Sequence, residues 1–222
     1  GVGRALRESG LPREDVFLVT KVWHDRLGRR DVLADADRFL DELGTDYVDQ
    51  LLIHWPNSGI TMEETLAAMD ALVQGGKART IGVSNFTVGH LEKALATSPQ
   101  PIAVNQVEIH PYLSQPELRK YCREKNVTVV AYRPVVKGKV NEDPVLSEIG
   151  RKHGRTAAQV TLRWMLQSGM VPIPRSKSRE HIEENYGALK FELEEEDLRR
   201  IDALDRGDRQ IDPVFAEFDG PR

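Results

Sequence analysis

The chain has 222 residues, of which 40% are hydrophobic and 30% are charged, a balance typical of globular proteins. It has no apolar run long enough to span a membrane, and a net charge of −4 without a basic stripe argues against nucleic acid as a partner. The single cysteine, Cys122, cannot form an internal disulfide, and no secretory signal is visible, so we expect a reducing compartment and a cytoplasmic location.

The first residues predict a helix whose apolar face carries Val2, Ala5 and Leu6 and which ends near Gly10. "GVGRAL" begins like the G-x-G-x-x-G dinucleotide-binding motif, but Leu6 occupies the third glycine position and no strand precedes it. We therefore reject that motif. Because the helix opens on glycine without a capping residue, we expect residue 1 to lie partway through a helix, with preceding elements missing.

Six short runs rich in Val, Ile, Leu and aromatic residues recur along the chain and predict strands. They show little strict alternation, which indicates strands covered on both faces. They span residues 16–23, 48–55, 79–86, 102–109, 127–135 and 170–176.

Amphipathic helical patterns lie between these runs. One helical stripe comprises Val32, Ala36, Phe39, Leu40 and Leu43. The sequences beginning at Thr61, Ser114 and Thr156 have the spacing of capping boxes, while Gly44 and Gly75 suit helix C-terminal caps.

The repeated strand–helix order predicts an α/β protein with a parallel sheet or barrel. An open doubly wound sheet should show the glycine motif at its first turn, and it does not. Six strands with two lost upstream would total eight. We therefore expect residues 1–222 to form a single (β/α)8 barrel domain that is incomplete at its N-terminus, lacking its first two strands.

Polar residues close each of the predicted strands. Lys21 ends the first, His54 ends the second, and Ser84 with Asn85 ends the third. In a parallel barrel these ends meet on the face that holds active sites. The other polar residues in or at the ends of the runs are Gln106, Tyr132, Arg133, Arg175 and Ser176.

These residues also carry a family resemblance. "FLVTKVW", "GTDYVDQLLIHWPN", "GKARTIGVSNF", "VNQVEIHPY", "AYRP" and "IPRSKSREHIEEN", in this order, resemble the aldo-keto reductases, and more narrowly their bacterial 2,5-diketo-D-gluconate/methylglyoxal reductase branch. The resemblance covers nearly the whole chain. It implies a (β/α)8 barrel that reduces aldehydes and ketones with NAD(P)H and without a metal.

The resemblance implies a catalytic Asp, Tyr, Lys and His. The lysine matches Lys21 and the histidine matches His54, whereas the Asp and Tyr belong to a segment upstream of residue 1. Tyr47 and Tyr112 lie in other motifs and are not taken as the acid. The missing aspartate is then the expected partner of Lys21, since a buried ammonium needs an anion. A solvent-reaching lysine and a core histidine are the structural alternatives.

For substrate binding, the resemblance implies that Trp23 and Trp55 line an apolar pocket with His54. A purely structural role is an equal alternative for each tryptophan. Phe215 and Phe218, in the irregular C-terminal tail, are candidates to cap that pocket, with a terminal hydrophobic clamp as the alternative.

For the cofactor, the resemblance implies hydrogen bonds from Ser84, Asn85 and Gln106 to the nicotinamide carboxamide, and stacking of Tyr132 on the ring. The residues that would border the pyrophosphate or hold the adenosine end are Pro134, Val135, Gly138, Arg175, Ser176, Lys177, Glu184 and Asn185. A solvated turn is the alternative for residues 137–139.

Two cofactor positions depart from the family pattern. Arg133 stands where serine usually follows the stacking aromatic residue, and His181 stands where an arginine often grips the 2′-phosphate. Because Arg175 and Lys177 retain positive charge, we expect NADPH, with NADH as the alternative.

Two rival functions stay open at this point. A strand-end lysine also suits a Schiff-base aldolase barrel, and the chain could be a catalytically silent NADP-binding or regulatory barrel. For the reductase we expect a small-molecule carbonyl substrate, no membrane partner and a monomer.

Overall fold

The structure, a computed structural model, describes residues 1–218. These residues form two compact units, the first comprising residues 1–105 and 215–218 and the second residues 106–214. The expectation of one domain over residues 1–222 stays a prediction. The chain alternates strands and helices as the sequence predicts, and neighbouring strands follow one another in chain order.

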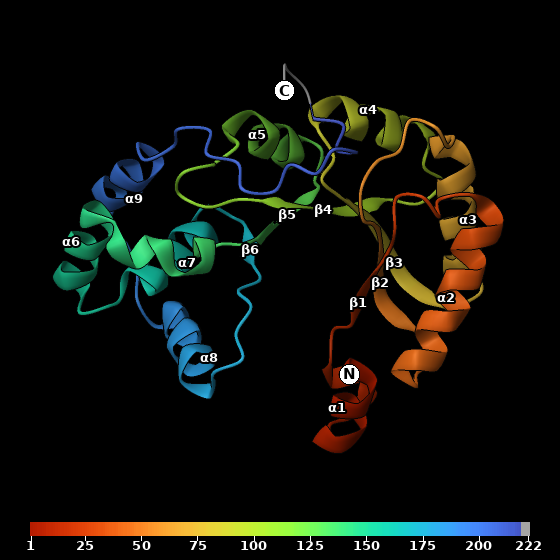
Figure 1. Ribbon diagram of the computed structural model, residues 1–222, viewed down its shortest axis with the longest axis horizontal. Coiled ribbons are helices and arrows are strands. Elements are labelled where there is room, and N and C mark those ends of the chain that lie inside the picture. Colours follow the sequence, from red (N-terminus) through yellow and green to blue (C-terminus); the bar gives the residue numbers. More distant parts are fainter. Residues whose placement is uncertain (219–222) are drawn as a thin grey trace. The chain divides into compact units, whose positions relative to one another are not determined.

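The first unit contains three parallel strands joined by helices, with the start of a fourth strand beside the third. Figure 1 shows α2 and α3 side by side along the outer side of these strands, and α1 next to the start of β1. The elements are α1 (Val2–Ser9), η1 (Arg13–Asp15), β1 (Val19–Val22), α2 (Arg29–Leu43), β2 (Val48–Ile53), α3 (Met62–Gln74), β3 (Ala78–Ser84), α4 (Val88–Thr97) and β4 (Ile102–Glu108), whose C-terminal end belongs to the second unit.

The second unit contains the end of β4 with β5 and β6 beside it, and β5 and β6 are parallel. Its elements are α5 (Pro116–Glu124), β5 (Thr128–Tyr132), η2 (Val136–Glu142), α6 (Pro144–His153), α7 (Ala157–Gln167), β6 (Val171–Pro172), α8 (Arg179–Tyr186), η3 (Gly187–Lys190) and α9 (Glu195–Asp202). These strand and helix positions confirm the α/β class predicted from the sequence.

The strands differ in burial, since β2 is buried along its whole length, whereas Val19 of β1 and Val171 of β6 are exposed. Every residue of β2 is buried, including the polar residues Asp49 and Gln50. Gly82 in β3 permits this packing, since a Cβ at that position would come within 2.8 Å of side-chain atoms of Leu52 and Val104. A larger residue there would push the neighbouring strands' side chains apart.

The predicted helix boundaries hold in part. The Thr156 capping box is formed, and Gly10 and Gly44 end their helices in the left-handed conformation. The capping box predicted at Ser114 is wrong, because Gln115 precedes α5 and the Ser114 hydroxyl donates to Asp205 instead. Thr61 precedes α3, but its side chain makes no capping hydrogen bond.

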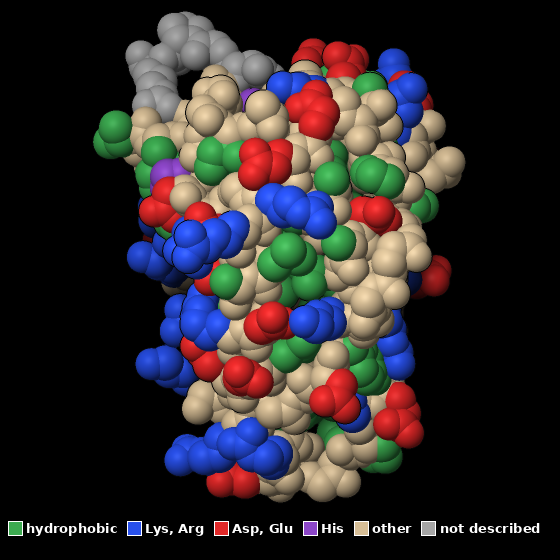
Figure 2. All heavy atoms as spheres, turned by 90° about the vertical axis from the view of Figure 1, so that its right-hand side faces the viewer, with side chains coloured by type: hydrophobic (Ala, Val, Ile, Leu, Met, Phe, Trp, Pro, Cys, Tyr) green, Lys and Arg blue, Asp and Glu red, His purple; other side chains and the backbone are tan. Residues whose placement is uncertain are grey.

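The outer face of the first unit carries interspersed acidic and basic side chains. Figure 2 shows them on the face turned to the viewer, which is the α2 and α3 side of Figure 1. Asp35 on α2 is the centre of one group, since Arg26 and Arg38 donate to its two oxygens at 2.8 and 3.0 Å. Pairs between exposed groups add little stability, so the buried Asp35 is the main contributor here.

A buried carboxylate ties the amino ends of the first three strands together. Asp49 in β2 accepts hydrogen bonds from Arg13 at 2.9 Å, Arg79 at 3.0 Å and the backbone amide of Leu18 at 2.9 Å. Both guanidinium groups also lie over the ring of Tyr47. Burial alone would raise the pKa of Asp49, but these hydrogen bonds and charges hold the pKa below its ordinary value.

No helix within residues 1–218 combines the length and the apolarity that crossing a bilayer requires.

We predict that Asp49→Asn destabilises the protein by about 2–4 kcal/mol, because two arginines lose their shared anion. Urea unfolding at neutral pH measures the loss. The pKa of Asp49 is lower in the folded than in the unfolded state, so its contribution is present at neutral pH and fades as the pH falls below about 4.

The exposed neighbour Asp46, which has no partner among the described residues, provides the matched control Asp46→Asn. Equal stability of Asp49→Asn and Asp46→Asn would contradict the role of the Asp49 carboxylate in holding Arg13 and Arg79.

Candidate functional site

Lys21 and His54 lie next to each other at the carboxyl ends of β1 and β2. Lys21 is paired in register with Leu52, and the backbone amide of His54 donates to the carbonyl of Val22 at 2.9 Å. Because side chains alternate along a strand, Lys21 shares a face of β1 with Val19 and Trp23, while Val22 points into the core. The parallel pairing of β1 and β2 thus brings the two predicted catalytic residues together.

The two side chains influence each other's protonation. Burial lowers the pKa of Lys21. Burial, and then the positive charge of Lys21, lowers the pKa of His54 to about 4. His54 is therefore a neutral imidazole at pH 7, with one ring N–H available as a donor. Within residues 1–218 no carboxylate lies at ion-pair distance from the Lys21 ammonium.

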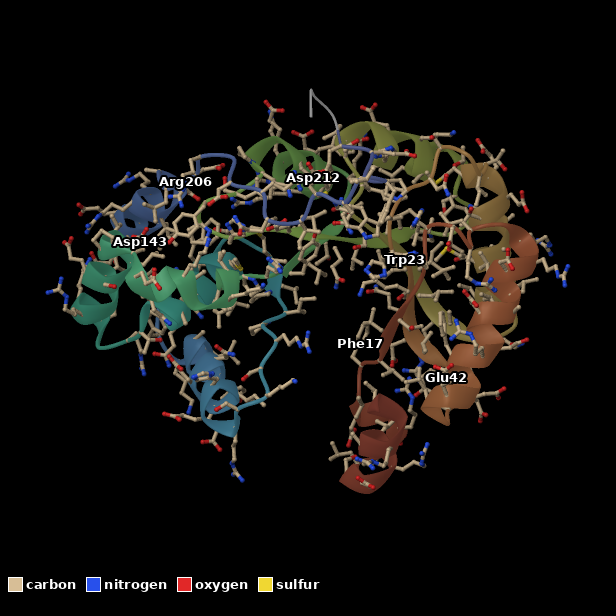
Figure 3. The ribbon with its side chains drawn as sticks, in the orientation of Figure 1. Phe17, Trp23, Glu42, Asp143, Arg206 and Asp212 are labelled. Atoms are coloured by element: carbon tan, nitrogen blue, oxygen red, sulfur yellow. The ribbon has the colours of Figure 1, made fainter. Side chains whose placement is uncertain are left out.

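Aromatic rings form a wall beside this pair. The ring of Trp23 meets that of His54 edge to face at 4.9 Å. Phe215 stacks on His24 at 4.0 Å and makes edge contacts with Trp23 and Trp55 at 5.7 and 5.6 Å. Trp55 is buried, whereas Trp23 is 41% exposed. Figure 3 shows Trp23 at the far end of β1 from Phe17.

The end of the described chain is held against this wall by polar contacts. The carboxylate of Glu217 accepts from the backbone amide of Ser58 at 2.7 Å and lies 3.4 Å from Nε2 of His90. The amide of Asn57 donates to the carbonyl of His24 at 2.7 Å, which fixes the loop after β1. The sequence reasoning proposed Phe215 and Phe218 as a cap but missed His24 and Glu217. The position of His24 directly after Trp23 at a strand end was the available signal.

Ser84 and Asn85 lie at the carboxyl end of β3, as Lys21 and His54 do at the ends of β1 and β2. Both are buried, and Asn85 adopts the left-handed conformation with φ 62°. Its side-chain amide donates to the carbonyl of His54 at 3.0 Å, which ties the end of β3 to the end of β2. Asn105, which the sequence reasoning did not single out, is fully buried and donates to the carbonyl of Phe86 at 2.9 Å. It fixes the turn that follows Asn85.

The remaining predicted cofactor residues lie in the second unit. Gln106 is buried in β4, and Tyr132 is half-buried at the end of β5, where burial raises its pKa. The loop after β5 contains several residues with positive φ, a backbone conformation that is rare for residues other than glycine. These are Arg133 at 55°, Val136 at 45°, Lys137 at 55° and Gly138 at 93°, next to Pro134 and Val135.

The residues after β6 leave several side chains in solvent. Arg175, Lys177 and His181 are exposed and form no ion pair within residues 1–218. The hydroxyl of Ser176 instead accepts from the backbone amide of Ser178 at 3.0 Å. Glu184 and Asn185 are half-buried on α8, and the carbonyl of Glu184 accepts from Gln159 at 2.9 Å.

The structure brings together Lys21, His54, Trp23, Trp55, Ser84 and Asn85 within the first unit. The two tyrosines that were set aside as acids are held elsewhere. Tyr47 lies between Arg13 and Arg79. The hydroxyl of Tyr112 donates to Asp143 at 3.1 Å, and burial, with the charge of Asp143, raises its pKa to about 12.

Comparisons with known proteins agree with one another. Residues 1–206 match a model of the Aldo/keto reductase family. The chain is 43% identical over 209 residues to glyoxal reductase of Bacillus subtilis (strain 168), covering 94% of this chain and 75% of that protein. It is 38% identical over 215 residues to methylglyoxal reductase DkgB of Escherichia coli O157:H7, covering 96% and 80%.

Solved structures show the same likeness. A crystal structure of a protein designated 2,5-diketo-D-gluconic acid reductase B superposes with a TM-score of 0.96 at 39% identity, covering all of this chain (100%) and 79% of that one. An aldo-keto reductase from a deep-sea metagenome library superposes with a TM-score of 0.92 at 35% identity, covering 99% and 82%. The strand–helix order is that of the (β/α)8 barrel expected from the sequence.

We predict that Phe215→Ala opens the aromatic wall and exposes Trp55, at a cost of about 1 kcal/mol in stability. Quenching of tryptophan fluorescence by acrylamide should increase. The adjacent residue Val214 is 90% exposed, so Val214→Ala is the matched control and should leave quenching unchanged. Unchanged quenching in Phe215→Ala would contradict the claim that Phe215 shields Trp55 from solvent.

Proposed function

Because the chain belongs to the aldo/keto reductase family and is an oxidoreductase, we propose that it reduces small aldehydes and ketones, dicarbonyls foremost, with NADPH. The names of two relatives, a glyoxal reductase and a methylglyoxal reductase, support small dicarbonyls as the substrate class. Keto sugar acids are the second candidate class, since a structural neighbour is designated a diketogluconic acid reductase.

One observation carries this proposal: a neutral imidazole lies beside an ammonium at adjacent strand ends, next to an aromatic wall. Since the pKa of His54 is about 4, its ring keeps a neutral N–H that can donate to a carbonyl oxygen and orient it. The charge of Lys21 then stabilises negative charge that develops on that oxygen.

The proton donor in this proposal is the catalytic tyrosine that the family resemblance implies. A tyrosine has an ordinary pKa near 10, and a neighbouring cation lowers it. Lys21 supplies that cation. Its ammonium has no carboxylate partner within residues 1–218.

The second unit offers groups that fit a dinucleotide. Arg175 and Lys177 are exposed cations without an ion pair among the described residues, as a 2′-phosphate requires. Gly138 has φ 93° and nothing within 4 Å of the position its Cβ would take, so backbone can approach a pyrophosphate there. Tyr132 would provide a flat stacking surface. When bound, the nicotinamide supplies the hydride.

The preference for NADPH rests on charge. His181 stands on α8 where the family resemblance implies an arginine, so this position lacks the permanent charge and the forked N–H donors of a guanidinium. Arg175 and Lys177 still favour the phosphorylated dinucleotide. We therefore expect the protein to bind NADH as well, but less tightly than NADPH.

A second function is favoured by one observation, the lowered pKa of Lys21, because a Schiff-base lysine also needs a depressed pKa. Borohydride treatment in the presence of substrate separates the two. Covalent trapping on Lys21 would support aldolase-type chemistry, whereas a reductase leaves the lysine unmodified.

We predict that the full-length protein oxidises NADPH in the presence of methylglyoxal, and that Lys21→Met and His54→Gln each lower kcat by about 10²–10⁴-fold. Loss of NADPH absorbance at 340 nm measures the rate. Methylglyoxal, a diketo sugar acid and NADH are compared in separate reactions, and we expect a lower KM for NADPH than for NADH.

The control for the first variant is Lys77→Met, which makes the same change at a partly exposed lysine paired with Asp37. It should retain the parent rate. No carbonyl-dependent turnover by the parent protein would remove the reductase assignment, and full activity of His54→Gln would remove the role of the imidazole.

A further inference from the structure

A groove with a volume of about 330 Å³ lies in the second unit, near the amino ends of β5 and β6. The predicted cofactor residues of this unit, such as Tyr132 and Arg175, follow the carboxyl ends of the same strands. The groove is therefore separate from them. Its lining residues are Arg119, Arg123, Asn126, Val127, Thr128, Val129, Ser168, Gly169 and Met170.

The groove is positively charged. Arg119 and Arg123 are four residues apart on α5, so their side chains lie on the same face of that helix. No acidic side chain lines the groove. Like charges at this spacing repel each other, and an anion between them would relieve that repulsion.

Several polar side chains of the groove have no protein partner. Within residues 1–218, the side chains of Arg123, Asn126, Thr128 and Ser168 form no hydrogen bond or ion pair. Together they offer a guanidinium, an amide and two hydroxyl groups, all of which can donate to one acceptor. Such a set suits a ligand with several oxygen atoms.

Arg119 is held in position by its neighbours. Its guanidinium lies 5.6 Å from the ring centre of Trp164 and 3.9 Å from a carboxylate oxygen of Asp202. That oxygen already accepts a hydrogen bond from the indole of Trp164 at 3.0 Å. Arg119 is thus oriented without a close hydrogen-bonded ion pair, so its N–H groups stay available to a ligand.

Two nearby sources of negative charge would repel an anion in the groove, and the structure reduces the effect of each. The C-terminal ends of α5 and α7 carry partial negative charge, but the amides of Val127 and Met170 already cap carbonyls of these ends at 2.8 and 2.9 Å. A second hollow shares Arg119 and Arg123 but is lined by Asp202 and Asp205, which repel anions. An anion is therefore directed to the groove that lacks carboxylates.

We propose that this groove binds a phosphate group, as inorganic phosphate or as part of a small phosphomonoester, between Arg119 and Arg123. Asn126, Thr128 and Ser168 donate to the remaining oxygens. Arginine pairs bind phosphate through parallel N–H donors, and a groove of this volume accommodates a small molecule. The site is independent of the proposed reductase activity.

Calorimetric titration of the full-length protein with inorganic phosphate, at constant ionic strength, tests the site. The variant Arg175→Gln/Lys177→Gln serves as the parent, so that phosphate cannot bind the predicted 2′-phosphate residues. We expect saturable binding that Arg123→Gln weakens about tenfold or more. Arg123 is exposed, so its replacement should not affect folding.

The matched control is Lys120→Gln, which removes one positive charge from the same helix but does not line the groove. It should bind phosphate like the parent. A repeat with glycerol 3-phosphate decides the source: tighter binding assigns a phosphomonoester, and weaker binding assigns the free ion. Absence of binding to either compound, or equal losses in Arg123→Gln and Lys120→Gln, would overturn the proposal.

Discussion

The half-buried ammonium of Lys21 beside the imidazole of His54 is the interaction on which the rest of the site depends. Parallel pairing of β1 and β2 places the two residues at adjacent strand ends, so each is fixed by backbone hydrogen bonds rather than by its own side chain. Burial and the neighbouring cation then set the protonation of His54. The chemistry of the site is therefore a consequence of strand register, because a shift by one residue would turn Lys21 into the core.

The surrounding structure supports this pair at both ends of the strands. At the amino ends, Asp49 binds Arg13 and Arg79, which stabilises the fold but touches no reacting group. At the carboxyl ends, Asn85 ties β3 to His54, and Phe215 stacks on His24. This division, with stability at one end and chemistry at the other, is typical of barrels built from parallel strands.

Much of this could be predicted from the sequence, because apolar strand runs and their polar ends are local patterns. Lys21, His54, Ser84 and Asn85 were all identified by position at strand ends. Other features join residues that are distant in the sequence, so no local pattern reveals them. These are the hydrogen bonds of Asp49, the contact of Glu217 with Ser58 and the groove at Arg119. The Ser114 capping box is not formed because Gln115, and not Ser114, is the residue that precedes α5, and the Ser114 hydroxyl donates to the distant Asp205.

NMR titration of the His54 imidazole tests the electrostatic pair most directly, with His54→Gln identifying its resonance. The account predicts a midpoint near pH 4, since the pKa is lowered to about 4, and a higher midpoint in Lys21→Met, where one of the two causes is removed. A midpoint near the ordinary value of about 6.5 that does not respond to Lys21→Met would contradict it.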